Sequence, residues 1–116
     1  KEQKNDTNSS LKGIGCFPGI VRGEIKKVYN HNDITDLNGK ILLAERTDPG
    51  WTPLFPTSKA IIVERGSSLS HSAIIARELG IPAIVNVKNI MKTLKNGDLI
   101  ELNGSTGEIK LMSEIN

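Results

Sequence analysis

The sequence predicts an α/β domain that is rich in strands and has few, short helices. Two observations favour this class. Short apolar runs recur along the chain between polar residues and turn formers, which is typical of buried strands. Only residues 70–79 combine helix-favouring side chains with a clear start and stop. The chain has 116 residues, 37% of them hydrophobic and 24% charged, which suits one folded domain.

The first ten residues differ from the rest, because residues 1–10 contain no large apolar side chain. Such a segment cannot bury enough surface to offset the entropy lost on ordering. We therefore expect a flexible linker at 1–10 and a single domain at 11–116. The chain does not begin with Met, so we expect it to be a fragment of a larger multidomain protein.

The strands follow from local patterns. Residues 20–29 alternate in part after the Pro18-Gly19 turn, three apolar runs come next, and the last two segments flank a turn of Asn and Gly residues. Strands are expected at 20–29, 40–45, 59–64, 84–85, 99–102 and 108–111. A short helix is expected at 89–94. A weaker helical turn is expected near 51–55, limited to its first turn by Pro53.

Composition excludes several classes of function. The net charge of +2 is small and the lysines are scattered, which argues against nucleic acid as a partner. No apolar run approaches the ~20 residues of a membrane span. Cys16 is the only cysteine, so no internal disulfide forms and a cytoplasmic location is favoured. No Cys/His spacing suggests a metal site, and no Walker-type loop is present to bind nucleotide.

The helix at 70–79 carries the candidate site. Ser70 is expected to cap it through its hydroxyl, and Gly80 with Pro82 to end it. Ser72, Ile75, Ala76 and Leu79 are expected to form its buried face. His71, one of two histidines, then lies in the first turn and projects past the helix end.

That placement suits phosphate chemistry. A helix N-terminus has free amides and a partial positive charge, which favour a bound anion and disfavour a protonated imidazole. His71 is therefore a candidate nucleophile that could hold a phosphoryl group. The predicted phosphate-binding residues are Gly66, Ser67, Ser68, Ser70 and Ser72.

Simpler interpretations stay open for each of these residues. Taken by itself, a histidine in a Ser-rich first turn is also explained as a helix start without chemistry. Arg77 is either a phosphate ligand or part of a structural ion pair. His31 is expected on the surface, Cys16 as a small buried residue rather than a reactive thiol, and Trp51 in the core.

Residues 66–83 resemble the phosphohistidine signature of the phosphoenolpyruvate-utilising enzymes. That family includes phosphoenolpyruvate synthase, pyruvate phosphate dikinase, enzyme I of the sugar phosphotransferase system and rifampicin phosphotransferase. The resemblance covers about residues 11–112, including an opening turn and strand from Gly13 to Gly23, the segment 47–55 and the closing hairpin. It implies a swivelling β/β/α domain whose histidine, here His71, shuttles a phosphoryl group between two remote sites.

The resemblance also implies partners and a reaction. An ATP-grasp domain of the same protein would transfer the β-phosphoryl group of ATP to His71, and a second domain would bind an acceptor such as pyruvate. Mg²⁺, ATP and the cations of the site are expected on those partner domains, with no cofactor on this one and no turnover by the isolated domain. The alternatives are transfer to a drug hydroxyl, charging from phosphoenolpyruvate as in enzyme I, and a swivelling module without catalytic role.

Three positions depart from the family pattern. Ser67 stands where a second glycine is usual, which predicts a stiffer loop, and Asn86 stands where glycine is common. Leu69 occupies the position at which dikinases carry a regulatory threonine, so control by that route is expected to be absent.

Overall fold

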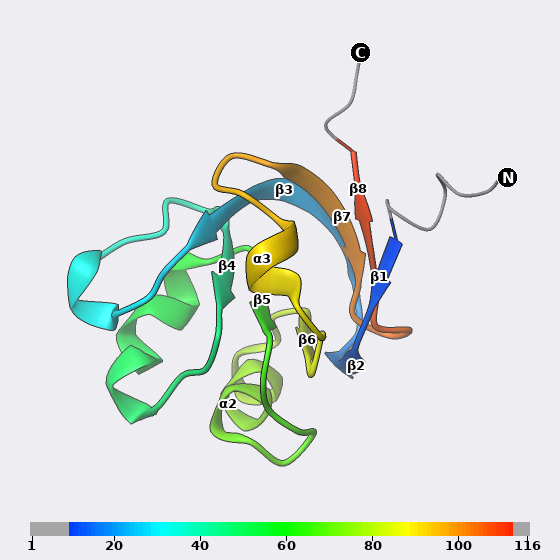
Figure 1. Cartoon of the computed structure of the whole chain (residues 1–116). Coiled ribbons are helices and arrows are strands. Elements are labelled where there is room, and N and C mark those ends of the chain that lie inside the picture. Colours follow the sequence, from blue (N-terminus) through cyan, green and yellow to red (C-terminus); the bar gives the residue numbers. More distant parts are fainter. Residues whose placement is uncertain (1–9, 113–116) are drawn as a thin grey trace, which may run out of the picture.

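A computed structural model describes residues 10–112; residues 1–9 and 113–116 lie outside the described part (Figure 1). Its strands are β1 (Ser10–Lys12), β2 (Ile14–Phe17), β3 (Ile20–Lys27), β4 (Ile41–Ala44), β5 (Ala60–Val63), β6 (Ala83–Val85), β7 (Leu99–Asn103) and β8 (Glu108–Leu111). The helices are α2 (His71–Leu79) and α3 (Ile90–Thr93), with two 3-10 segments, η1 (His31–Asp33) and η2 (Pro49–Thr57). Within residues 10–112, no helix is long and apolar enough to cross a membrane.

All eight strands join one mixed sheet in the order β1-β8-β7-β3-β4-β5-β6-β2. The pairs β3–β4, β4–β5 and β5–β6 are parallel, and the other pairs are antiparallel. The two edge strands, β1 and β2, are separated in the chain by Gly13 alone. The sheet therefore curls until its edges meet, and Figure 1 shows this strong curvature. The strand-rich α/β class predicted from the sequence is confirmed.

The parallel strands are buried on both faces. In β4, Ile41 and Leu43 pack into one core cluster, and Leu42 and Ala44 pack into a second. The first cluster lies within the curved sheet and includes Ile90 and Leu94 at α3, whereas the second lies under α2 and η2. Burial on both faces requires apolar residues in succession, which is why these strands appear in the sequence as continuous apolar runs.

Four glycines, Gly13, Gly15, Gly104 and Gly107, bring the β1–β2 segment against the β7–β8 turn, and we call them the glycine seam. The Gly13 amide donates to the Gly107 carbonyl at 2.8 Å. A Cβ atom at Gly15 would collide with the Gly104 carbonyl, and one at Gly104 would collide with the carbonyl oxygen of Phe17. Backbone contacts backbone at the seam, so no side chain fits there.

The predicted strands from 20 to 111 are all present, and β7 and β8 form the expected hairpin. Two strands were not predicted, β1 and β2. Ser10 was assigned to the linker, but it begins β1 and pairs with Lys110, so the linker prediction is wrong at that residue. The remaining linker residues, 1–9, lie outside the described part.

The helical segment at η2 is longer than predicted. It runs over nine residues with Pro53 and Pro56 inside it, whereas only a first turn near 51–55 was expected. The fixed φ of proline, near −65°, lies within the 3-10 range, so proline is compatible with such turns. Asp48 caps the segment by accepting from the Gly50 amide at 2.8 Å.

Candidate functional site

Helix α2 begins at His71, as predicted, and ends at Gly80 in the left-handed conformation with φ 72°. Its buried face is formed by Ser72, Ala73 and Ala76, and Ile75 is half-buried. Leu79 was predicted on that face but is exposed, because the helix ends within one residue of it. The helix packs against β2, β6 and η2, which leaves its N-terminal end open.

The His71 ring is held by η2. Its centroid lies 6.1 Å from that of Phe55, and its Nε2 atom lies 3.4 Å from Thr52 Oγ1. The Nδ1 atom is buried and has no hydrogen-bond partner among the described residues. Nε2 is therefore the ring nitrogen that has a polar neighbour. The contacts with Thr52 and Phe55 of η2 fix the orientation of the ring.

A pocket of about 280 Å³ opens beside the ring. It is lined by Arg46, Thr47, Arg65, Gly66, Ser70, His71 and Ser72. Arg46 follows β4 and Arg65 follows β5, and these strands are parallel neighbours. Loops after the carboxyl ends of adjacent parallel strands meet at one edge of a sheet, which is a common place for a ligand site.

The first turn of α2 has free amides. Its first helical hydrogen bond runs from the Ile74 amide to the Ser70 carbonyl at 3.0 Å. The amides of His71, Ser72 and Ala73 have no partner among the described residues. Three donors at a helix N-terminus form a site that favours an anion.

The capping role predicted for the Ser70 hydroxyl is wrong. Ser70 occupies the N-cap position, but its side chain accepts from no helix amide. Its hydroxyl instead donates to the Ser67 carbonyl at 2.7 Å, and its oxygen lies 3.4 Å from Ser72 Oγ. The hydroxyl closes the loop that precedes the helix, which leaves the first amides open.

The segment 66–70, which we call the site loop, contributes only some of the predicted phosphate-binding residues to the pocket. Gly66 and Ser70 line it, as does Ser72 just beyond, whereas Ser67 and Ser68 do not. Ser67 Oγ accepts from the Leu69 amide at 3.1 Å. Ser67 therefore shapes the site loop through this bond, and the phosphate-binding roles of Ser67 and Ser68 stay predictions.

Arg77 fastens the site loop to β2. Its Nη2 atom donates to the Ser68 carbonyl at 2.6 Å, and its Nε atom donates to the Cys16 carbonyl at 3.2 Å. These acceptors are backbone carbonyls, so the ion pair considered for Arg77 is not what holds it. Its position is that of a structural residue behind the loop.

The sequence did not point to four residues that lie at the site, namely Arg46, Thr47, Thr52 and Arg65. The expectation that this domain lacks cations at the site is wrong, because both arginines line the pocket. A signal was present in the sequence, since each arginine lies within two residues after an apolar run that forms a parallel strand. The sequence alone does not show that those two strands, β4 and β5, are neighbours in the sheet.

The remaining residues of interest have plain roles. Cys16 is half-buried, and burial raises the pKa of its thiol, an effect that the charge of Arg77 opposes. Trp51 is buried, as predicted.

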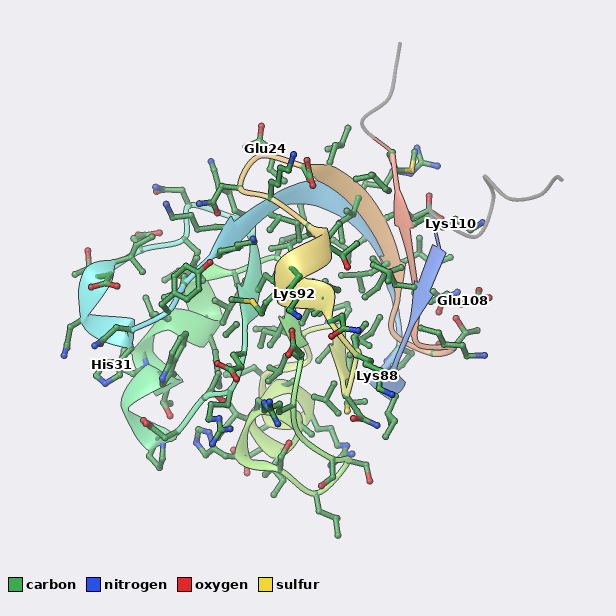
Figure 2. The ribbon with its side chains drawn as sticks, viewed as in Figure 1. Glu24, His31, Lys88, Lys92, Glu108 and Lys110 are labelled. Carbon is green, nitrogen blue, oxygen red and sulfur yellow. The ribbon has the colours of Figure 1, made fainter. Side chains whose placement is uncertain are left out.

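His31 was expected on the surface but is half-buried, and its ring centroid lies 6.1 Å from that of Trp51. Figure 2 shows His31 at one edge of the molecule, away from Lys92 on α3. Asn86 has φ 61°, a left-handed conformation that explains a preference for glycine there.

Comparison with known proteins agrees with this geometry. A family model described as "PEP-utilising enzyme, mobile domain" matches residues 36–107. The chain belongs to this family. The resemblance seen in the sequence is thereby confirmed.

Two relatives and one solved structure illustrate the family. A rifampicin phosphotransferase from Bacillus cereus is 37% identical over 96% of the chain, and a probable phosphoenolpyruvate synthase from Pyrococcus horikoshii is 36% identical over 91%. The chain spans 13% of the length of each of these relatives. A solution structure of Enzyme I superposes with a TM-score of 0.59 at 28% identity, covering 73% of this chain and 34% of that one. The matched region is thus one part of larger phosphotransferases.

Proposed function

We propose that this domain is a mobile phosphoryl carrier in which His71 is transiently phosphorylated. The observation that carries the proposal is the position of His71 at the start of α2, with its ring beside a pocket that has free amides and two arginines. A nucleophile and the groups that stabilise its phosphorylated form lie together. Phosphoryl transfer depends mainly on positioning and charge stabilisation, and this arrangement supplies both.

In the charging step, an imidazole nitrogen attacks the β-phosphorus of ATP, which is bound with Mg²⁺ on a separate ATP-grasp domain. A nitrogen–phosphorus bond forms, the bond from the β-phosphorus to the oxygen of AMP breaks, and the ring loses a proton. Water then attacks the γ-phosphorus of the pyrophosphoryl group left on His71, the bond from that phosphorus to the bridging oxygen breaks, and inorganic phosphate leaves. The buried Nδ1 atom favours Nε2 as the attacking nitrogen.

In the second step, an acceptor oxygen attacks the phosphorus, the nitrogen–phosphorus bond breaks, and His71 returns to its starting form. We propose the enolate oxygen of pyruvate as the acceptor, which yields phosphoenolpyruvate. The similarity to a probable phosphoenolpyruvate synthase supports this choice. The similarity to a rifampicin phosphotransferase supports a second candidate, a hydroxyl group of a drug.

The test uses the full protein that contains this chain, incubated with ATP labelled at the β-phosphorus. We expect an acid-labile label on His71, no label in His71→Asn, and full labelling in the matched variant His31→Asn. A protein that takes no label, or a His71→Asn variant that keeps it, contradicts the proposal. Labelling by phosphoenolpyruvate but not by ATP would assign the domain to the enzyme I type, and full parent activity in His71→Asn would assign it to a non-catalytic module.

A further inference from the structure

We propose that Arg46 and Arg65 are the cationic ligands of the phosphoryl group on His71, an inference that rests on the proposed function. Neither residue belongs to the signature around His71, and 19 positions separate them in the chain. Their assignment comes from the pocket, which both of them line together with the His71 ring. They hold the transferred group and do not attack it, so their role is binding and positioning.

The sheet places the two arginines beside each other. The parallel pairing of β4 and β5 reaches Ala44 and Val63 and then continues beyond the strand ends. The Glu64 amide donates to the Ala44 carbonyl and the Arg65 amide to the Glu45 carbonyl, both at 2.9 Å. These bonds fix the backbones of the two loops together at the edge where α2 begins.

The charges around the pocket favour an anion. Arg65 Nε lies 3.0 Å from Glu45 Oε2, so one edge of its guanidinium is held and its other donors remain available. Arg46 has no ion-pair partner among the described residues. Within residues 10–112, no carboxylate lines the pocket itself, and the charge of Arg77 lies behind the site loop. The two positive charges of Arg46 and Arg65 exceed the single negative charge of Glu45. The excess favours a phosphoryl group, which carries a charge of about −1.5 to −2 near neutral pH.

Guanidinium groups suit this task. Their planar arrays of donors match the oxygens of a phosphoryl group, and hydrogen bonds between charged partners are stronger than neutral ones. A nearby positive charge also favours the doubly ionised phosphoryl group over the singly ionised one, and so lowers its second pKa. The second pKa of the phosphoryl group therefore depends on whether the two arginines lie beside it. If the arginines only supported the fold, replacing them would leave this pKa unchanged.

The experiment uses the 116-residue chain with His31→Asn as background, so that His71 is the one histidine left. Phosphoramidate, a small phosphoryl donor, phosphorylates the imidazole without ATP, and the phosphorus NMR shift is followed against pH. We expect Arg46→Gln and Arg65→Gln each to raise the pKa of the phosphoryl group, and the double variant to raise it by about one unit or more. Arg65→Lys keeps the charge and is expected to restore most of the pKa lowering.

Arg22→Gln is the matched control, because Arg22 also pairs with a carboxylate, Glu101, at 2.8 Å but lies on β3 away from the pocket. A double variant whose phosphoryl pKa equals that of Arg22→Gln would overturn the inference and leave the amides of α2 as the ligands. Thermal unfolding of each variant verifies that the domain is folded during the titration. Because charging is chemical, this outcome is independent of whether ATP labels His71.

Discussion

The glycine seam and the site loop both consist mainly of small residues, but they use them for different reasons. At the seam, backbone meets backbone, and a Cβ atom at Gly104 or Gly107 would collide with a carbonyl oxygen. In the site loop, Ser67 and Ser70 make hydrogen bonds that shape the turn. The seam excludes side chains, whereas the loop uses short ones.

The difference shows that two kinds of small-residue segment can be told apart by what surrounds them. Close approach of two backbones makes a position intolerant of any side chain, with consequences for the stability of the whole domain. A loop held by side-chain hydrogen bonds loses little stability when one bond is removed, and in this chain such a loop lies directly before the candidate nucleophile His71. Substitutions in the two regions should therefore separate stability from function.

The largest effect is expected at the seam. Gly104→Ala places a methyl group against the Phe17 carbonyl, and overpacking of this kind should lower the free energy of unfolding by about 3 kcal/mol. Urea denaturation of the chain measures it. Gly39→Ala is the control, because Gly39 has φ 77° and no atom within 4 Å of the added methyl, so its cost should be only about 1 kcal/mol. Equal costs for the two would show that the seam is not tightly packed.

The next effect concerns the link between the site loop and the sheet. Arg77→Gln removes the hydrogen bonds to the Ser68 and Cys16 carbonyls and should cost about 1–2 kcal/mol in the free energy of unfolding. Arg22→Gln removes a single ion pair of an exposed arginine and should cost less than about 1 kcal/mol. The comparison is made in the same urea titration. If the two variants unfold alike, Arg77 does not anchor the loop.

Position 86 adds a third case to this comparison. Glycine is favoured there because of the positive φ of the backbone, and not because of close packing or of a side-chain hydrogen bond. With φ 61°, Asn86→Ala should cost about 1 kcal/mol, while Asn86→Gly should leave the stability almost unchanged. Thermal unfolding of both variants tests this. A cost for glycine as large as that for alanine would point to the Asn86 side chain rather than to its backbone.

The smallest effect is expected in the site loop itself. Ser67→Ala removes the bond from the Leu69 amide and should cost about 0.5 kcal/mol, because the group is exposed to water. Labelling of His71 by β-labelled ATP in the full protein should persist in this variant. A loss of stability comparable to that of Gly104→Ala would erase the distinction between the two regions.

Much of the fold could be predicted because the parallel strands are buried on both faces. The runs at β4, β5 and β6 are apolar throughout, so the sequence marks them clearly. The strands β1 and β2 escaped prediction for the opposite reason. Gly13 and Gly15 interrupt the alternation of side chains there, since the seam needs glycine where a strand would normally show an apolar residue.

The grouping of the candidate residues follows from a local signal, and their role in binding phosphate stays a prediction. His71, Gly66, Ser70 and Ser72 lie within seven residues and share one pocket. The two arginines could not be found in this way, because the pairing of β4 with β5 brings them to that pocket. The direction of the Ser70 hydroxyl was also beyond the sequence, since an N-cap serine can donate to a loop carbonyl as readily as it accepts from an amide.

The pairing of Ser10 with Lys110 places the entry and the exit of the described fold side by side. Figure 1 shows the start of β1 and the end of β8 at one end of the molecule and α2 at the other. We expect a small rotation about these adjoining chain ends to carry His71, at the start of α2, through a wider arc than β1 or β8, without breaking a hydrogen bond within the sheet.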